Sequence, residues 1–157
     1  MNKNKAQLKE EIRYAIRLCQ RQARFYRFIQ WTVTTLSIIG GSAIFSVLST
    51  TLPHWLSFTG AVLLGLSGAL LIGLRPADKA AANETDIKRY QALMVKSVSW
   101  NEAELEAAIE EARQSDAPEI EALRNVAFND VMREINRDDQ LIPLTPSEKI
   151  MGLLANN

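Results

Sequence analysis

A stretch of forty-seven residues, 28–74, contains no Asp, Glu, Lys or Arg. The hydrocarbon core of a membrane is about 30 Å thick and takes roughly 20 helical residues to cross, so this stretch has room for two crossings. It is interrupted near its middle by Leu52-Pro53-His54-Trp55. We therefore expect one transmembrane helix over residues 28–52 and a second over residues 55–74, joined as a membrane hairpin.

Two other interpretations of this stretch fit less well. Helices buried in a water-soluble bundle usually keep a polar face for solvent, and neither apolar run has a charged residue on any face. A secretory signal peptide has a short charged region and an apolar region of about 7–15 residues. Here twenty-seven residues precede a much longer apolar run. The stretch is therefore expected to stay in the mature protein.

The two segments that flank the uncharged stretch carry opposite charge. Residues 1–27 hold eight basic residues and two acidic ones, whereas residues 75–157 hold ten basic residues and sixteen acidic ones. This pattern predicts that the two flanks pair with each other, and the basic segment is also suited to anionic lipid headgroups. Because basic residues lie outside both ends of the hairpin and the short connector has none, the positive-inside rule predicts that both termini are cytoplasmic. We expect a bacterial inner-membrane protein.

The flanking segments show helical periodicity. Residues 4–27 form an amphipathic pattern that continues into the first apolar run without Gly or Pro, which predicts one unbroken helix. Within the cytoplasmic tail, residues 77–157, Asn101 with Glu104 and Thr145 with Glu148 form capping patterns, and Pro118 is suited to a first helical turn. No convincing alternation of period two is present. We predict a single-unit, all-α membrane protein of 157 residues, with a two-helix transmembrane hairpin, an N-terminal amphipathic helix and cytoplasmic C-terminal helices.

Residues that could support catalysis are sparse. His54, in the connector, is the only histidine, and Cys19 is the only cysteine, which fits a small packing residue. Asp138 and Asp139 are adjacent, but two loop carboxylates without further ligands are a weak cation site. No phosphate-binding glycine loop, zinc-protease motif or nucleophile elbow is present. We therefore expect no catalytic residue, no cofactor and no metal, and do not expect an enzyme.

Small residues recur every four positions along the second apolar run. Such a row leaves a shallow groove on a membrane helix, into which another helix can pack at close range. The partner is either the first span of the same chain or a neighbouring subunit. The residues of this small-residue row are Ala61, Gly65, Ala69 and Gly73.

Hydroxyl side chains recur along one side of the first apolar run. In one interpretation they bond to preceding carbonyls or across to the second span. In the other, several hairpins gather and the hydroxyls line a central pathway, which they would wet without charge selectivity. The residues of this hydroxyl stripe are Thr32, Thr35, Ser42, Ser46 and Ser49. Since two helices cannot enclose a conduit, any pore must be an oligomer, and the lack of ionisable residues in the spans argues against an ion-coupled carrier.

Two stretches after the second span resemble a known family. The first runs from Ala80-Ala81-Ala82-Asn83 to Tyr90-Gln91-Ala92-Leu93, and the second from Ser115-Asp116-Ala117-Pro118-Glu119-Ile120 through Leu123-Arg124-Asn125 to Asn129-Asp130-Val131. Together with the order of parts, they resemble the SLATT family, the SMODS and SLOG-associating two-transmembrane effector proteins of prokaryotes. The resemblance implies an effector that assembles in the membrane in response to phage, and companions that make or sense nucleotides. It brings no catalytic residues.

Two functions are therefore expected. The first is a homo-oligomeric inner-membrane effector that forms or gates a pore in an anti-phage system. The second is a membrane-anchored scaffold, of host or phage origin, that recruits a soluble partner through its acidic tail. The expected partners are membrane lipids, further copies of the chain and a cytoplasmic protein or nucleotide-signalling partner, but not nucleic acid.

Overall fold

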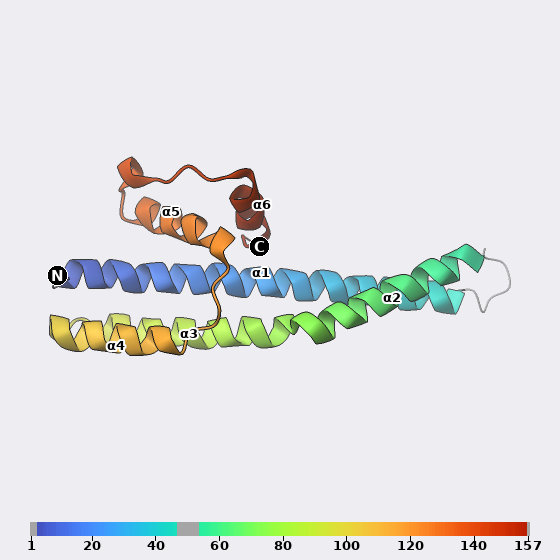
Figure 1. The fold of residues 1–157 in the computed structure, drawn as a ribbon, viewed down its shortest axis with the longest axis horizontal. Helices are drawn as coiled ribbons and strands as arrows, with labels where there is room; N and C mark the ends of the chain where they lie inside the picture. Colours follow the sequence, from blue (N-terminus) through green and yellow to red (C-terminus); the bar gives the residue numbers. More distant parts are fainter. Residues whose placement is uncertain (1–2, 47–53, 157) are drawn as a thin grey trace. The chain divides into compact units, whose positions relative to one another are not determined.

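The computed structural model describes residues 3–46 and 54–156, and every regular element in them is helical (Figure 1). The chain divides into two compact units. The hairpin unit is Tyr26–Asp78, and the helical unit combines Met1–Phe25 with Lys79–Asn157. The helices are α1 (Lys5–Ser46), α2 (His54–Leu74), α3 (Pro76–Lys96), α4 (Glu102–Gln114), α5 (Arg124–Glu134) and α6 (Pro146–Leu154), with short 3-10 turns η1 (Glu121–Leu123) and η2 (Asp138–Gln140).

Helix α1 runs without interruption through residues 5–46, which confirms the predicted continuous helix. Its start is capped, since the backbone N–H of Gln7 donates to Oδ1 of Asn4 at 2.8 Å and that of Asn4 donates to Oε1 of Gln7 at 3.0 Å. Side-chain acceptors of this kind satisfy N–H groups that have no partner inside the helix. The predicted end of the first span, at residue 52, and most of the connector lie outside the described residues.

In the hairpin unit, α1 and α2 pack against each other in opposite directions. Oγ of Ser37 donates to Oγ of Ser67 at 2.6 Å. A Cβ atom built on Gly40 would lie 2.7 Å from the carbonyl oxygen of Gly60 and 2.9 Å from the backbone nitrogen of Leu64. As the residue number rises along α1 it therefore falls along α2, so the two helices are antiparallel neighbours.

One helical stretch, Trp55–Lys96, is long and apolar enough to cross a membrane by length and composition. It comprises α2 and α3, which meet at Arg75. Arg75 has a φ of 46°, in the left-handed region, and Pro76 then begins α3. Proline lacks the N–H that would continue the α2 ladder, so the predicted stop at Leu74-Arg75-Pro76 is observed.

The first core of the helical unit lies among α1, α3 and α4. Leu8 and Ile12 of α1 pack with Tyr90 and Leu93 of α3, and Met94 lies against the same cluster. Leu105, Ile109 and Ala112 of α4 complete it. This is the packing expected when the apolar stripes of three amphipathic helices face one another.

A second core lies where α5 and α6 cover the other side of α1 (Figure 1). It contains Leu18 of α1, Leu123, Ala127 and Ala155. Both predicted capping boxes are present, from Asn101 to Glu104 at the start of α4 and from Thr145 to Glu148 at the start of α6. The sequence signals for these two helices are therefore confirmed.

The basic segment of α1 pairs with the acidic tail, as the charge pattern predicts. Arg17 binds Glu134 at 2.5 Å and Arg21 binds Asp130 at 2.8 Å, both on α5. One pair has the opposite polarity, with the acidic residue on α1: Glu11 accepts a hydrogen bond from Arg113 of α4 at 3.2 Å. These contacts join segments more than one hundred residues apart in the sequence.

The start of the α5 region differs from the prediction. Pro118 is not in the first turn of a helix, because residues 116–120 are not helical and the first turn, η1, begins at Glu121. The backbone N–H of Ala117 donates to Oδ2 of Asp86 at 3.0 Å, which holds this linker against α3. A tertiary hydrogen bond thus replaces the local helix start that a proline favours.

Candidate functional sites

The hairpin unit exposes the apolar side chains that a soluble core helix would bury. In the most apolar eighteen-residue window of the Trp55–Lys96 stretch, 11% is buried. On α2, Phe58 and Ile72 are 73% and 79% exposed, and Trp31 and Ile38 on α1 are also exposed. An exposed apolar surface of this extent marks a membrane or protein contact.

The small-residue row lies on the exposed surface of α2. All four of its members, Ala61, Gly65, Ala69 and Gly73, are exposed. A Cβ atom built on Gly65 or Gly73 meets nothing within 4 Å. The face of α2 that meets α1 is a different one, which includes Gly60 and Ser67. Within one chain, the row is therefore not the contact between the two helices.

The hydroxyl stripe of α1 is divided between two environments. Oγ1 of Thr35 donates to the Trp31 carbonyl at 2.9 Å, and Oγ of Ser42 donates to the Ile38 carbonyl at 2.8 Å. These are the bonds to preceding carbonyls that the plainer interpretation predicts. Oγ1 of Thr32 is buried and has no hydrogen-bond partner within the described residues. The side chain of Ser46 and all of Ser49 lie outside the described part.

The contact between the two apolar helices is made by residues that the sequence patterns did not select, Ser37, Gly40 and Ser67. The sequence positions of these residues relative to the connector predict this pairing. Ser37 and Ser67 each lie fifteen residues from Leu52, and Gly40 and Leu64 each lie twelve from it. In a tight antiparallel hairpin, residues equally distant from the connector face each other, so this register could have been read from the connector position.

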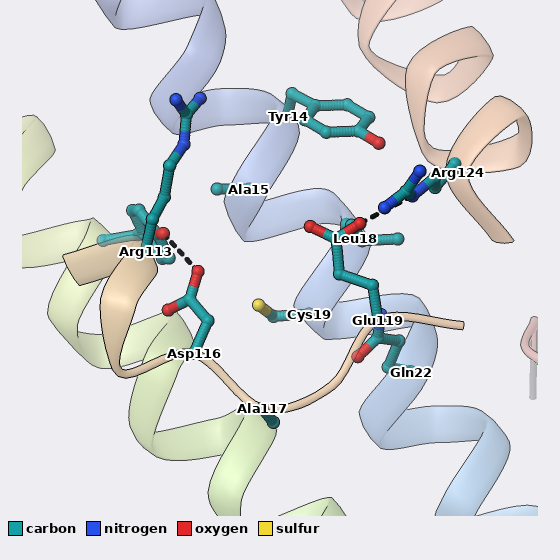
Figure 2. A pocket seen from close by; sticks show the side chains of 11 residues that line it. Tyr14, Ala15, Leu18, Cys19, Gln22, Arg113, Asp116, Ala117, Glu119 and Arg124 are labelled. Carbon is teal, nitrogen blue, oxygen red and sulfur yellow. Dashed lines mark hydrogen bonds and ion pairs between the residues drawn. The ribbon is translucent and has the colours of Figure 1, made fainter. Parts of the chain in front are cut away.

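The helical unit contains a pocket of about 300 Å³, with polar and apolar lining, between α1, α3 and the segment that follows α4 (Figure 2). Ala15, Leu18 and Cys19 of α1 form one wall. The remaining lining residues are polar or flank the linker: Tyr14, Gln22, Tyr90, Arg113, Asp116, Ala117, Glu119 and Arg124. Figure 2 shows the side chains of Asp116 and Cys19 close to the centre of this group.

The linker wall of the pocket is held by hydrogen bonds to α3. The hydroxyl of Tyr90 donates to Oδ2 of Asp116 at 2.5 Å. Arg89 donates to Oγ of Ser115 at 2.6 Å and forms an ion pair with Asp86 at 3.3 Å. On the outer side, Arg124 donates to Glu119 at 2.6 Å. The charged groups around the pocket are therefore mostly paired with one another.

Burial sets the protonation states inside the pocket. It raises the pKa of the Cys19 thiol to about 12, with help from the nearby carboxylate of Asp116. Burial also raises the pKa of Asp116 above its ordinary value, while the hydrogen bond from Tyr90 opposes that rise. The pKa of Tyr90 is raised by burial and by the same hydrogen bond. Since the thiolate is the reactive form of cysteine, Cys19 is a packing thiol at neutral pH, as the sequence suggests.

Two buried polar atoms in the pocket have no hydrogen-bond partner within the described residues. They are Nε2 of Gln22, whose residue is 1% exposed, and Oδ1 of Asp116. An unpaired buried polar group costs about 1–3 kcal/mol. Oδ1 of Asp116 lies 3.8 Å from Nη1 of Arg89, so the amide of Gln22 is the donor that the pocket offers most directly to water or a small polar molecule.

Within the described part of the chain, Asp138 and Asp139 do not join a larger group of metal ligands. Asp138 and Asp139 are exposed in η2, and Asp139 pairs with Arg137 at 3.5 Å. The side chain of His54 lies outside the described part of the chain. Among the described residues, no group of three or more His, Cys, Asp or Glu side chains is placed to hold a metal ion.

No protein-family model, curated protein or solved structure matches this chain.

Proposed function

We propose that this protein is a non-enzymatic inner-membrane effector that crosses the membrane twice and oligomerises to form or gate a pore. The function in anti-phage defence is the one that the resemblance to the SLATT family implies. The observation that carries the proposal is the outward position of the small-residue row on an exposed apolar helix. Exposed apolar side chains on both helices are stable in contact with lipid and unfavourable in contact with water. In lipid, a row of small residues is the surface on which further helices pack.

Both helices of the hairpin are proposed to cross, with both termini in the cytoplasm. A single crossing would leave the exposed apolar surface of α1, which includes Trp31, Ile38 and Ile39, in water. The Ser37–Ser67 hydrogen bond and the close approach at Gly40 are contacts suited to lipid, where association of helices relies on close packing and interhelical hydrogen bonds. Thr35 and Ser42 of the hydroxyl stripe bond to carbonyls of their own helix and not to α2, so the stripe is proposed to be a surface that neighbouring subunits can share.

Gating is proposed to pass along α1. This helix belongs to the helical unit up to Phe25 and to the hairpin unit from Tyr26 onward, and it is continuous across that boundary. A ligand that binds one arrangement of the helical unit more tightly than another would increase the population of that arrangement, and the continuous α1 would transmit the change to the hairpin unit. The signal is proposed to be a cytoplasmic protein or a product of nucleotide signalling.

The test is membrane depolarisation on expression, compared between two substitutions. Gly65→Leu fills the small-residue row, and we expect it to abolish depolarisation while the protein remains in the membrane fraction. Gly41→Leu adds the same volume to α1 at a position where a Cβ meets nothing within 4 Å, and we expect it to depolarise as the wild type does. Equal depolarisation by Gly65→Leu and the wild type would contradict the role of the row.

A scaffold is the second candidate, because the tail exposes apolar side chains of its own. Ile150 and Leu153 on α6 are 59% and 71% exposed. Such exposed apolar side chains would suit a soluble partner of the tail. Purified protein in liposomes separates the two functions: a pore releases a trapped dye as protein density rises, whereas a scaffold leaves the liposomes sealed at every density.

A further inference from the structure

A groove of about 530 Å³ lies at the end of the hairpin unit where α2 stops. It is lined by Gln30 of α1, by Leu71 and Ile72 of α2, and by the segment Arg75-Pro76-Ala77-Asp78. All of these residues belong to the hairpin unit. The groove therefore joins the last apolar turn of α2 to the first charged residues after it.

The polar groups of the groove form a pair of opposite charges. Nε of Arg75 lies 2.9 Å from Oδ2 of Asp78, and both side chains are largely exposed. This ion pair brings one guanidinium nitrogen to one carboxylate oxygen, so the other guanidinium donors of Arg75 and the second oxygen of Asp78 remain available. Gln30 adds an amide at the same level, from the other helix.

The backbone holds Arg75 in a costly conformation. Its φ of 46° lies in the left-handed region, which costs a residue with a side chain roughly 1–2 kcal/mol relative to the right-handed helix. Glycine would adopt this conformation without that cost. An arginine kept in a strained position beside a groove is a sign that its side chain has a use there.

We propose that this groove holds the headgroup of a membrane phospholipid with a primary ammonium, that is, a phosphoethanolamine. The phosphate binds the free donors of Arg75, and the ammonium donates to the free oxygen of Asp78. The acyl chains lie along the exposed apolar surface of α2, on which Ile72 and Leu66 are 79% and 60% exposed. The zwitterion thus matches both charges of the pair, and its apolar part matches the adjoining helix.

This inference rests on the proposed membrane crossing, and it makes a prediction about lipid chemistry. A phosphocholine headgroup has the same phosphate and positive charge but no N–H, so it cannot donate to Asp78. A phosphoglycerol headgroup has the phosphate but no cation. We expect the delipidated protein, analysed by native mass spectrometry with each lipid in turn, to retain phosphatidylethanolamine over phosphatidylcholine roughly tenfold, the contribution of one charge-assisted hydrogen bond.

Three substitutions test the assigned roles. Asp78→Asn should remove the preference for phosphatidylethanolamine over phosphatidylcholine, and Arg75→Gln should lower the retention of all three lipids. Arg137→Gln is the matched control, because Arg137 is an exposed arginine paired with Asp139 in the helical unit. It should retain lipids as the wild type does.

Two results would overturn the inference, and they are distinguishable. If wild-type protein is recovered in membranes but retains phosphatidylethanolamine and phosphatidylcholine equally, the headgroup site is wrong and the membrane crossing stands. If the protein is absent from the membrane fraction, both the crossing and the headgroup site are wrong.

Discussion

At the scale of single residues, the clearest requirement is at Gly40. Any side chain there meets the backbone of α2, because the nearest atoms to a built Cβ are the carbonyl oxygen of Gly60 and the nitrogen of Leu64. Backbone atoms cannot move aside as the end of a flexible side chain can. The neighbouring Gly41 has open space around it, so the two adjacent glycines have different roles.

This difference predicts opposite effects of the same substitution. Gly40→Ala should lower the free energy of unfolding of the hairpin by about 1–3 kcal/mol, as overpacking does. Gly41→Ala should be neutral or stabilising by up to about 1 kcal/mol, since alanine is the better helix former. Titration with a denaturing detergent, followed by circular dichroism, measures both. A destabilising Gly41→Ala together with a neutral Gly40→Ala would contradict the observed register.

The hydroxyl of Tyr90 is the second residue-scale feature, because it donates to one oxygen of the partly buried Asp116 carboxyl. Tyr90→Phe leaves Oδ2 of Asp116 without its donor and should cost about 1–3 kcal/mol of stability. Tyr14→Phe is the control, since no hydrogen bond involves the Tyr14 hydroxyl within the described residues, and it should cost far less. Urea unfolding of the detergent-solubilised protein compares the two, and equal losses would contradict a specific role for Tyr90.

The same carboxyl predicts a dependence on pH. The pKa of Asp116 is higher in the folded chain than its ordinary value of 3.8, chiefly because of burial. The folded state therefore binds the proton more tightly, so the contribution of Asp116 to stability is full below pH 3.8 and is lost as the pH rises through the folded pKa. We expect Asp116→Asn to reduce the loss of stability on going from about pH 4 to pH 7. An unchanged pH profile in this variant would contradict the assignment.

At the scale of elements, Arg21 joins three helices. Its Nε binds Asp130 of α5 at 2.8 Å, and its Nη1 donates to the carbonyls of Gly152 and Ala155 at 3.3 Å each. The same nitrogen donates to Oδ1 of Asn156 at 3.0 Å. The positive guanidinium also interacts favourably with the negative end of the α6 helix dipole. Arg21 thus fastens both α5 and α6 to α1.

Removing this side chain should release α5 and α6 together. Arg21→Gln is expected to lower the free energy of unfolding by about 3 kcal/mol, because it leaves a largely buried Asp130 without its partner. Hydrogen exchange should speed up over residues 124–156 and not over α3. Arg24→Gln, which changes an exposed arginine one turn further along α1, is the control and should leave the exchange pattern unchanged. Uniformly faster exchange in both variants would argue against this role.

At the scale of the whole molecule, the two units have different surfaces. The helical unit has two apolar cores and several ion pairs, whereas the hairpin unit exposes its apolar side chains. The proposed topology places the two units in different solvents, water and lipid. The chain should therefore resist extraction with alkaline carbonate.

Accessibility of single cysteines tests that topology in a Cys19→Ser background. In intact spheroplasts, an impermeant maleimide should label Trp55→Cys, near the connector, and should label Asp139→Cys, in the tail, only after lysis. Neither position is covered by other residues of the chain. Labelling of the tail cysteine before lysis would contradict cytoplasmic termini.

The sequence by itself determined the features of this protein that depend on neighbours along the chain. The continuous α1, the stop at Arg75 and the capping boxes at Asn101 and Thr145 follow from local periodicity, from proline and from side chains within one helical turn. The pairing of the basic and acidic flanks was also predictable, because it depends on total charge. The apolar stretch was also evident from the sequence, because hydrophobicity depends on composition and not on tertiary contacts.

The tertiary structure alone decided which faces meet. Helix α2 has small residues on more than one side, so its sequence permits packing through the Ala61–Gly73 row or through Gly60 and Ser67, and only the position of α1 selects the second. The extended linker at Pro118 and the adjoining pocket depend likewise on Asp86 and Tyr90, which lie 31 and 26 residues before the linker residues that they contact. Contacts between distant residues contribute free energies of the same size as local preferences, so they can override a local signal such as the proline. The local sequence does not show which contact will do so.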